Sequence, residues 1–335
     1  MSGVTAKEAQ EAREAREARE RAGGRSGPAP ARPPAPSRDP RRVREHREWL
    51  AAGLFLAPDV LGLLVFVAVP MALSVGLSFF RVSGFGAYEW IGLGNYRRML
   101  DDPLFWDSMR ITGLYVVVLV PVLFCVSLGL GLLVKQRLPG VGAYRTALFL
   151  PYVISLVVVG VLWKFLLDEQ TGAVNRAVRA AGFDGASWLG LPSLALGCVI
   201  AVMVWVMMGY YMIIFLAGLQ EIPQEYYEAA RIDGAGPWTT FRRITWPLLR
   251  PTSFFVLLMS TVAALTGGLD LIFVLTNGGP ANGTSLAIFY IYQQAFGYGE
   301  YGYASAMGSF LVLIMVAVSA VIFRFTQGGR FDDGA

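Results

Sequence analysis

The chain has 335 residues, of which 55% are hydrophobic and only 16% are charged. Length alone would favour about two soluble domains, but soluble domains carry about 25% charged residues. The composition therefore excludes an ordinary soluble protein and indicates an integral membrane protein.

The net charge of +4 belongs to the N-terminal tail. Residues 1–48 hold 12 of the 28 Lys and Arg residues and 8 of the 24 Asp and Glu residues, so the rest of the chain carries 16 of each sign. A basic segment beside a membrane span is a topology anchor. The charge therefore gives no reason to expect a nucleic-acid partner.

Residue types that most catalytic sites need are scarce. The two cysteines, Cys125 and Cys198, lie inside apolar runs and have neither disulfide nor metal-binding spacing. The only histidine, His46, is in the tail, which excludes a zinc site, a His proton relay and a Ser-His-Asp triad from the membrane part. No GxxxxGKS or GxxxxGKT motif is present, so no P-loop for ATP is expected. We expect no catalytic residue, no metal and no cofactor.

The tail divides into two segments. Residues 1–27 include EAREAREARE, in which Glu–Arg pairs favour a transient helix, but no apolar face is available for burial. Residues 28–40 are Pro-rich and should form an extended spacer. No signal peptide is predicted, because the first apolar run is too long and lacks a small-x-small cleavage site. We predict a disordered charged tail over 1–48, a transmembrane domain over 49–327 and a short tail over 328–335.

Six apolar runs are long enough to cross a bilayer, which takes about 20 residues each. They cover residues 50–80, 111–134, 144–167, 193–219, 252–276 and 305–325. The predicted fold class is an all-α integral membrane protein of the plasma membrane with six transmembrane helices. The basic cluster Arg41, Arg42, Arg44 and Arg47 places the N-terminus in the cytoplasm, and six crossings then place the C-terminus there too.

A polar stretch, residues 225–251, separates the fourth and fifth runs. Pro223 favours a helix start and Gly234 a helix stop, and Gly236-Pro237 forces a turn before a second helix begins at Trp238. Small residues make the first helix slim, so that another protein's backbone can approach closely. The alternative is an amphipathic segment lying in the headgroup region.

This stretch carries a family resemblance. The pattern Glu228-Ala229-Ala230-x-x-Asp233-Gly234-Ala235, followed by Phe241-x-x-Ile244-x-x-Pro247-x-x-x-Pro251, resembles the EAA loop of ABC-importer permeases in its carbohydrate-uptake form. In that family the loop is a cytoplasmic coupling helix that docks into a groove on an ATPase. Trp246 departs from the pattern, which usually has leucine before the proline, and this leaves the local packing open.

The resemblance implies a role for most of these residues. Glu228 and Asp233 are expected to make polar docking contacts. Gly234 and Ala235 are expected to keep the helix slim enough for the groove. Pro247 and Pro251 are expected to fix its angle to the fifth span.

Other stretches resemble the same family, over about residues 50–326. They are Asn95-Tyr96, Asp102-Pro103-x-Phe105-Trp106, Leu150-Pro151-Tyr152, Trp163-Lys164-Phe165, Leu275–Pro280 with Thr284, and Tyr292-Gln293-Gln294-Ala295-Phe296. The set is typical of the first permease of a carbohydrate-uptake pair, as in maltose and glycerol-3-phosphate importers. The resemblance implies a second permease as heterodimer partner, an ABC ATPase dimer, an extracellular sugar-binding lipoprotein and a sugar substrate. The Ala-, Arg- and Gly-rich tail is typical of a high-GC bacterium.

Three ionisable residues lie within the apolar runs, where charges are costly and often functional. Asp59 could cap its helix in the first turn, and Lys164 is close enough to the outer interface to snorkel. Asp270 follows Gly267-Gly268, which can open the helix. Asp270 and Asn277 are our candidates for the substrate path. A buried pair that joins two spans is the alternative for Asp270.

The glycine turn after the fifth run is small, uncharged and rigid. Its residues Gly278, Gly279 and Pro280 are our candidates for docking an external binding protein, and a plain turn is the alternative. Tyrosines in the second half of the chain could stack on a pyranose ring. Most tyrosines near a membrane surface are interface residues, however, so none is assigned.

Two other functions stay open at this point. A stand-alone secondary transporter or channel would need inverted repeats or intramembrane ion ligands, but the halves show no repeat and Asp270 is the one good carboxylate. A membrane scaffold with a partner-binding tail would leave residues 225–251 unexplained. The sequence does not name the sugar: polyols and glycerol-3-phosphate remain open, although an anionic substrate should need basic residues, and only Lys164 is near.

Overall fold

The computed structural model describes residues 4–23, 53–82, 88–135 and 140–325. Most of the predicted N-terminal tail and the whole predicted C-terminal tail lie outside the described residues. The chain divides into two units, residues 1–68 and 69–335. In the first unit, α1 (Val4–Gly23) exposes all its side chains from 10 to 21, and a second helix becomes π-helical at η1 (Leu64–Ala68).

Asp59 does not cap a helix as predicted. The helix already includes Gly53, so Asp59 lies well past its first turn with an exposed side chain. The helix Gly53–Leu77 is long and apolar enough to span a membrane. The capping prediction was wrong because Pro58, which is compatible with a helix start, here lies inside the helix.

The second unit opens with short elements and then a long helix. Strands β1 (Phe80–Arg81) and β2 (Glu89–Trp90) pair antiparallel, between α3 (Val69–Leu77) and α4 (Gly94–Leu100). Helix α5 covers Pro103–Lys135 and so begins at residue 103 rather than 111. The reason is local: Asp102 Oδ1 accepts hydrogen bonds from the N–H groups of Leu104 (2.9 Å) and Phe105 (3.4 Å), and proline suits the first helical position.

The third predicted span is broken in two. Helices α6 (Val141–Val153) and α7 (Leu156–Leu166) meet at 98°. Pro151 lacks an N–H in the last turn of α6, and the backbone at Ile154 is extended. A short helix, α8 (Ala173–Ala180), then precedes α9 (Pro192–Glu221).

The polar stretch after α9 folds into short helices. They are α10 (Gln224–Ile232), α11 (Pro237–Thr240), the π-helix η2 (Phe241–Thr245) and α12 (Trp246–Leu248). We call residues 224–248 the coupling segment. Helix α13 (Arg250–Thr266) meets the end of the segment at 67°.

The fifth predicted span is also broken, at the glycines that the sequence singled out. Gly268 has φ +84 and separates α13 from α14 (Leu269–Leu275). Glycine takes this left-handed conformation at little cost, so the predicted opening of the helix is confirmed. The chain continues through α15 (Ala287–Tyr292), η3 (Gln293–Gly297) and α16 (Tyr301–Phe325).

Within the described residues, four helices are long and apolar enough to cross a membrane: Gly53–Leu77, α5, α9 and α16. The number rises to six if each bent pair, α6 with α7 and the end of the coupling segment with α13, counts as one span. This agrees with the all-α fold of six spans predicted from the apolar runs.

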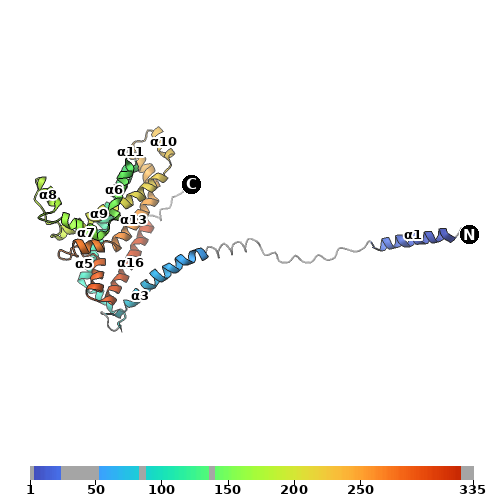
Figure 1. Cartoon of the computed structure of the whole chain (residues 1–335), viewed down its shortest axis with the longest axis horizontal. Helices are drawn as coiled ribbons and strands as arrows, with labels where there is room; N and C mark the ends of the chain where they lie inside the picture. The colour runs from blue at the N-terminus through green and yellow to red at the C-terminus, as the bar shows by residue number, and fades with distance from the viewer. Residues whose placement is uncertain (1–3, 24–52, 83–87, 136–139, 326–335) are drawn as a thin grey trace. The chain divides into compact units, whose positions relative to one another are not determined.

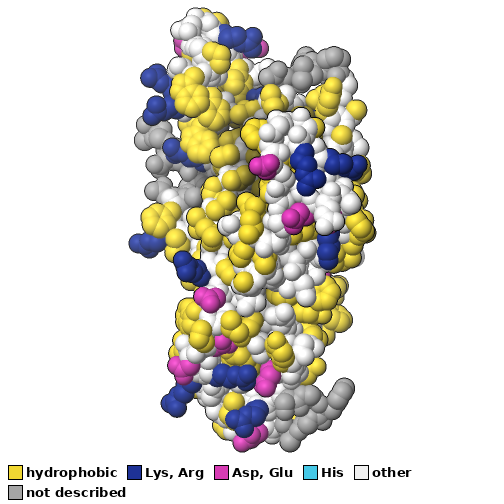
Figure 2. Space-filling view, turned by 90° about the vertical axis from the view of Figure 1, so that its left-hand side faces the viewer, with side chains coloured by type: hydrophobic (Ala, Val, Ile, Leu, Met, Phe, Trp, Pro, Cys, Tyr) yellow, Lys and Arg dark blue, Asp and Glu magenta, His cyan; other side chains and the backbone are white. Residues whose placement is uncertain are grey.

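Helices α5 and α9 pack along each other in the second unit. Helices α6 and α13 pack against this pair, and α16 packs against α13 (Figure 1). A buried cluster joins Tyr115 and Leu119 of α5 to Met203 and Val206 of α9. Hydrophobic side chains also cover a wide area of one outer face, and charged side chains lie toward its ends and along both of its sides (Figure 2). In lipid such helices associate through close van der Waals packing.

Candidate functional site

Helix α10 has a well-defined end. Its last residue is Ile232, and Gly234, two residues later, has φ +70. The N–H groups of Gly234 and Ala235 bond to the carbonyls of Arg231 (3.1 Å) and Ala230 (2.9 Å). This pair of bonds is a Schellman motif, which requires a left-handed residue where Gly234 stands. The helix stop predicted at Gly234 is therefore confirmed, and its cause is the backbone conformation.

The residues of the EAA pattern lie on both sides of this helix end. Ala230 is buried and Ala235 is half-buried, so this side of α10 lies close to the rest of the fold. The other side is exposed and consists of acidic and small residues, namely Glu228, Ala229, Asp233 and Gly234. Beside them the apolar side chain of Ile232 is 86% exposed.

Apolar side chains fasten the second half of the coupling segment to the spans. Phe241 and Leu248 pack against a buried cluster from α5, α9 and α13, and Ile244 is half-buried. The second helix, predicted to begin at Trp238, is not one regular α-helix. Residues 241–245 instead form the π-helix η2, which has more residues per turn and often occurs at functional sites.

Two tryptophans flank this packing. The Trp246 ring lies 6.3 Å from the rings of both Phe241 and Phe124, so aromatic packing accommodates the departure from leucine at this position. Trp238 stacks on Phe241 at 5.7 Å, yet 71% of its surface is exposed. Trp246 therefore supports the fold, whereas Trp238 presents an apolar surface to the outside.

The two prolines lie on either side of a bend. Pro247 is in the first turn of α12 and Pro251 in the first turn of α13, where a missing N–H costs nothing. Leu249 between them is fully buried, and the helix axes meet there at 67°. That the prolines set this angle stays a prediction.

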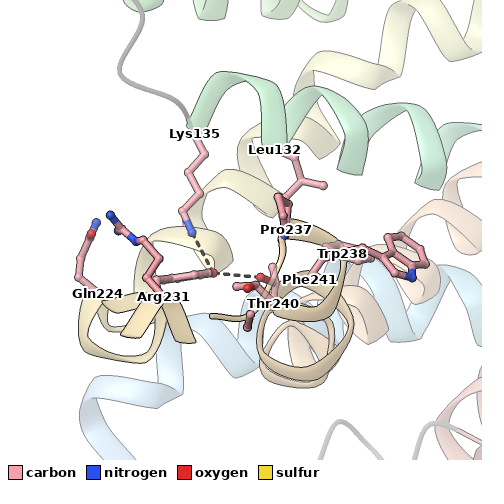
Figure 3. Close-up of a pocket in the computed structure, with 11 residues that line it drawn as sticks. Leu132, Lys135, Gln224, Arg231, Pro237, Trp238, Thr240 and Phe241 are labelled. Carbon is pink, nitrogen blue, oxygen red and sulfur yellow. Dashed lines mark hydrogen bonds between the residues drawn. The ribbon is translucent and has the colours of Figure 1, made fainter. Parts of the chain in front are cut away.

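A cavity of 990 Å³ lies between the coupling segment and the end of α5. Lys135 reaches from α5 into this space (Figure 3). Its Nζ donates a 3.0 Å hydrogen bond to the hydroxyl of Tyr227, and that hydroxyl lies 3.2 Å from Thr245 Oγ1. The Lys135 ammonium is also 4.1 Å from the centroid of the Tyr227 ring. A chain of polar contacts thus runs from α5 through α10 to η2.

The break between α13 and α14 has an unusual neighbour. The hydroxyl of Tyr115 lies 3.6 Å from the point where a Cβ on Gly268 would stand. Tyr115 is fully buried, yet within the described residues its hydroxyl has no hydrogen-bond partner. Such groups are costly and need a reason. Asp270, two residues after Gly268, is exposed in the first turn of α14.

The glycine turn after α14 is held firmly in place. Thr284 is fully buried and donates to the carbonyl of Gly279, with its hydroxyl also 2.7 Å from Thr276 Oγ1. Asn277 is exposed with φ +49, and Gly278 faces the ring of Phe289. The turn is thus a fixed structure and presents a small surface.

Lys164 contacts the backbone of a neighbouring helix. It is exposed and its Nζ lies 3.4 Å from the carbonyl of Val274, in the last turn of α14, where a lysine favours the helix end.

The two motifs near the start of α5 that resemble the permease family, one at Asn95-Tyr96 and one that begins at Asp102, make structural hydrogen bonds. Asn95 is buried and donates to the carbonyls of Ser78 (2.8 Å) and Phe80 (2.9 Å).

The carboxylate of Asp102 organises the start of α5. Besides the two backbone bonds of Oδ1, its Oδ2 accepts hydrogen bonds from Tyr290 (2.7 Å) and Tyr303 (2.6 Å). Burial raises the pKa of this carboxyl, but the hydrogen bonds from Tyr303, Tyr290 and the backbone together outweigh burial and hold the pKa below its ordinary value of 3.8.

Nothing in the residue pattern distinguished Tyr115, Tyr227 or Thr245 in advance. Tyr227 directly precedes Glu228 of the EAA pattern, and this position is the one signal that could have drawn attention to it. The sequence likewise assigned no role to Lys135. Its contact with Tyr227 depends on how α5 and α10 approach each other in space.

Comparison with known proteins adds to this geometry. The family described as "Binding-protein-dependent transport system inner membrane component" matches residues 116–328. The chain is 36% identical over 279 residues to the probable ABC transporter permease protein YesP of Bacillus subtilis, which covers 82% of this chain and 90% of that protein. It is 34% identical over 281 residues to the sulfoquinovosyl glycerol transport system permease protein SmoG of Agrobacterium fabrum, covering 83% and 91%.

A solved structure has the same fold. It is a chain of a bacterial alginate ABC transporter in complex with an alginate pentasaccharide-bound periplasmic protein, with a TM-score of 0.73 and 24% identity, covering 84% of this chain and 95% of that chain. The family match takes in α9, the coupling segment and α13–α16. The chain therefore belongs to the family of inner membrane components of binding-protein-dependent transport systems, and it is a multi-pass transport permease.

Proposed function

We propose that this chain is the first of two permease subunits in an ABC importer for a carbohydrate, in a bacterial plasma membrane. Its relative SmoG is named for a sugar glycoside, and the alginate transporter of the same fold was solved with an oligosaccharide-bound periplasmic protein. The carbohydrate form of the EAA pattern agrees with this. The chain performs no chemistry itself, and a separate ATPase dimer hydrolyses ATP.

The observation that carries the proposal is the outer surface of α10. Glu228 and Asp233 offer exposed carboxylates there, and Gly234 adds no bulk. Ile232 of α10 and Trp238 of α11 are large apolar side chains that are 86% and 71% exposed. Exposed apolar groups rimmed by polar ones mark binding surfaces, and a short helix of this kind suits a groove. We assign this surface to the ATPase.

The other EAA residues connect this surface to the spans. In the proposal, Ala230, Ala235, Phe241 and Ile244 hold the segment on the membrane part, and Pro247 and Pro251 direct it into α13. Closure of the ATPase dimer on ATP would bring the coupling segments of the two permeases together. That movement would turn the spans from inward-facing to outward-facing.

We place the substrate path at the break between α13 and α14. A helix interrupted by glycines leaves backbone groups free to bind a ligand. The hydroxyl of Tyr115, which has no hydrogen-bond partner among the described residues, faces Gly268, and a sugar hydroxyl could bond to it. Asp270 and Asn277 then provide further acceptors and donors along the path.

We place the docking of an extracellular sugar-binding lipoprotein at the turn Gly278–Pro280. Support comes from the rigidity of the turn, which the buried Thr284 holds through Gly279 and Thr276. A fixed surface loses little entropy when a partner binds. With the coupling segment in the cytoplasm and six spans, both chain termini are cytoplasmic and this turn is external.

The test is to purify the tagged chain from native membranes and to identify what accompanies it. We expect an ABC ATPase, a second six-span permease and a binding lipoprotein, whose bound compound then identifies the sugar. The purified assembly is then placed in liposomes. Assemblies whose ATPase faces the interior should take up that compound only when ATP is present inside the liposomes. A chain that is isolated alone and imports along an ion gradient would establish the stand-alone transporter instead.

A further inference from the structure

The contacts of Lys135, Tyr227 and Thr245 connect three elements. Lys135 is the last residue of α5, Tyr227 is in α10, and Thr245 ends η2. An ammonium group only donates, so the Tyr227 oxygen accepts from Lys135 and its own hydrogen is free for Thr245. One hydroxyl group thus joins a long membrane helix to both halves of the coupling segment.

The surroundings strengthen these contacts. Thr245 is 4% exposed, and Lys135 and Tyr227 are half-buried. Among the described residues no carboxylate forms a salt bridge with Lys135, so its ammonium interacts with the Tyr227 hydroxyl and ring. A hydrogen bond with a charged donor is stronger than a neutral one, and partial burial limits competition by water.

Because the cavity separates the coupling segment from the end of α5, these contacts help to fix the position of the segment relative to α5. All three residues line the space of 990 Å³, and their polar contacts link its α5 side to the coupling segment. The chain connects the coupling segment to α9, through Ile222 and Pro223, and to α13, across the 67° bend. No backbone connection joins the segment to α5. Its alignment with α5 therefore depends on side chains.

We propose that Lys135, Tyr227 and Thr245 are positioning residues that transmit movement of the coupling segment to α5. The proposal rests on the proposed function, because the movement is the one that an ATPase would impose. None of the three belongs to the exposed surface of α10 assigned to docking. Their loss should therefore leave the ATPase bound but weaken communication with the spans.

The test uses the whole assembly, with both permeases and the ATPase, in liposomes. The readout is the rate of ATP hydrolysis with saturating binding lipoprotein, as isolated with its native ligand, divided by the rate without it. Tyr227→Phe keeps the ring and removes both hydrogen bonds, so we expect this ratio to fall about tenfold, the equivalent of one or two such bonds. The basal rate and the amount of bound ATPase should not fall.

A matched control is available next to the site. Tyr226 is 52% exposed and, within the described residues, makes no hydrogen bond through its hydroxyl. Tyr226→Phe should keep the wild-type ratio. A Tyr227→Phe assembly with the same ratio as Tyr226→Phe would overturn the proposal.

Two variants of Thr245 test the proposal independently, in case Tyr227→Phe does not fold. Thr245→Val removes the hydroxyl and should lower the ratio, whereas Thr245→Ser keeps it and should restore most of the stimulation. Lys135→Met should lower the ratio as well, and combining it with Tyr227→Phe should cost little more, because both remove one connection. Equal ratios in Thr245→Val and Thr245→Ser would contradict a positioning role.

The outcomes separate this proposal from the proposed function. If the wild-type assembly contains no ATPase, or hydrolysis does not respond to the binding lipoprotein, the proposed function fails and this inference fails with it. If the wild type responds and Tyr227→Phe, Thr245→Val and Lys135→Met respond as strongly as the wild type, the proposed function stands and the positioning role is wrong.

Discussion

The hydroxyl of Tyr303 donates a 2.6 Å hydrogen bond to Asp102, although the two residues are 201 positions apart in the chain. Tyr290 donates to the same oxygen at 2.7 Å. Arg98 lies 4.1 Å from the centroid of the Tyr303 ring and pairs with Glu300 at 3.2 Å. This cluster ties the start of α5 to α15 and α16.

Tyr303→Phe should therefore destabilise the protein while keeping the packing of the ring. The variant removes one hydrogen bond to a charged group, which is worth about 1.5–3 kcal/mol. Thermal unfolding of the purified chain in detergent measures this. Tyr298→Phe is the control, because Tyr298 is 70% exposed and should show no change. Equal melting temperatures in the two variants would show that the Tyr303 bond contributes nothing.

The hydrogen bonds to Asp102 should also make the stability of the protein depend on pH. The pKa of Asp102 is lower in the folded chain than its ordinary value of 3.8, because the hydrogen bonds outweigh burial. The unfolded chain then binds more protons near that pH, so the contribution of Asp102 is complete above 3.8 and is lost as the pH falls below it. Unfolding at neutral and acid pH should show a smaller acid loss in Asp102→Asn than in the wild type. The same loss in both would assign the effect to other carboxyls.

Gly234→Trp should insert in the membrane normally but no longer bind the ATPase. The substitution places a bulky side chain on the proposed docking surface. It also forces a left-handed conformation on a residue with a Cβ, which costs about 1–2 kcal/mol. Co-purification of the ATPase and stimulated hydrolysis measure the effect.

Gly182 provides a control with the same backbone strain. It ends α8 in the same Schellman pattern, with bonds from Gly182 to Arg179 (3.0 Å) and from Phe183 to Val178 (3.1 Å), and it has φ +87. Like Gly234, it has no atom within 4 Å of where a Cβ would stand. Gly182→Trp should leave ATPase binding intact. Loss of binding in both variants would point to general destabilisation instead of a docking surface.

Tyr115→Phe should separate function from stability. The hydroxyl it removes is buried without a partner in the described part of the chain, so the free energy of unfolding should stay the same or rise, since an unsatisfied group costs about 1–3 kcal/mol. If that hydroxyl binds the sugar, the KM for uptake of the compound carried by the binding lipoprotein should increase several-fold. An unchanged KM would remove Tyr115 from the substrate path.

The spans were predictable because length and hydrophobicity are local properties of the sequence. The break at Gly267-Gly268 was predictable for the same reason, since glycine lowers the cost of a left-handed residue wherever it stands. The break after Val153 could not be predicted from the sequence. Pro151 lies inside α6, and a proline inside an apolar run is also compatible with a continuous, kinked span.

The candidate site also has some features that could be predicted from the sequence and others that could not. The stop at Gly234 follows from the glycine itself, so sequence was enough. The contact between Lys135 and Tyr227 joins residues 92 positions apart, and it depends on how α5 and α10 pack. That the Tyr115 hydroxyl has no partner in the described part of the chain depends on the path of α14, and nothing in an apolar run distinguishes this tyrosine from any other.

The breaks after α6 and α13 have a consequence for engineering. Helices α7 and α14 follow these breaks, and they pack against each other. Residues 167–191 follow α7 directly, and residues 276–286 follow α14. The two short helices and their loops, residues 156–191 and 269–286, can therefore be exchanged together between related permeases, and each exchanged segment starts at a natural interruption of a helix. Such chimaeras would change the surface beyond α7 and α14 while leaving α5, α9 and the coupling segment as they are.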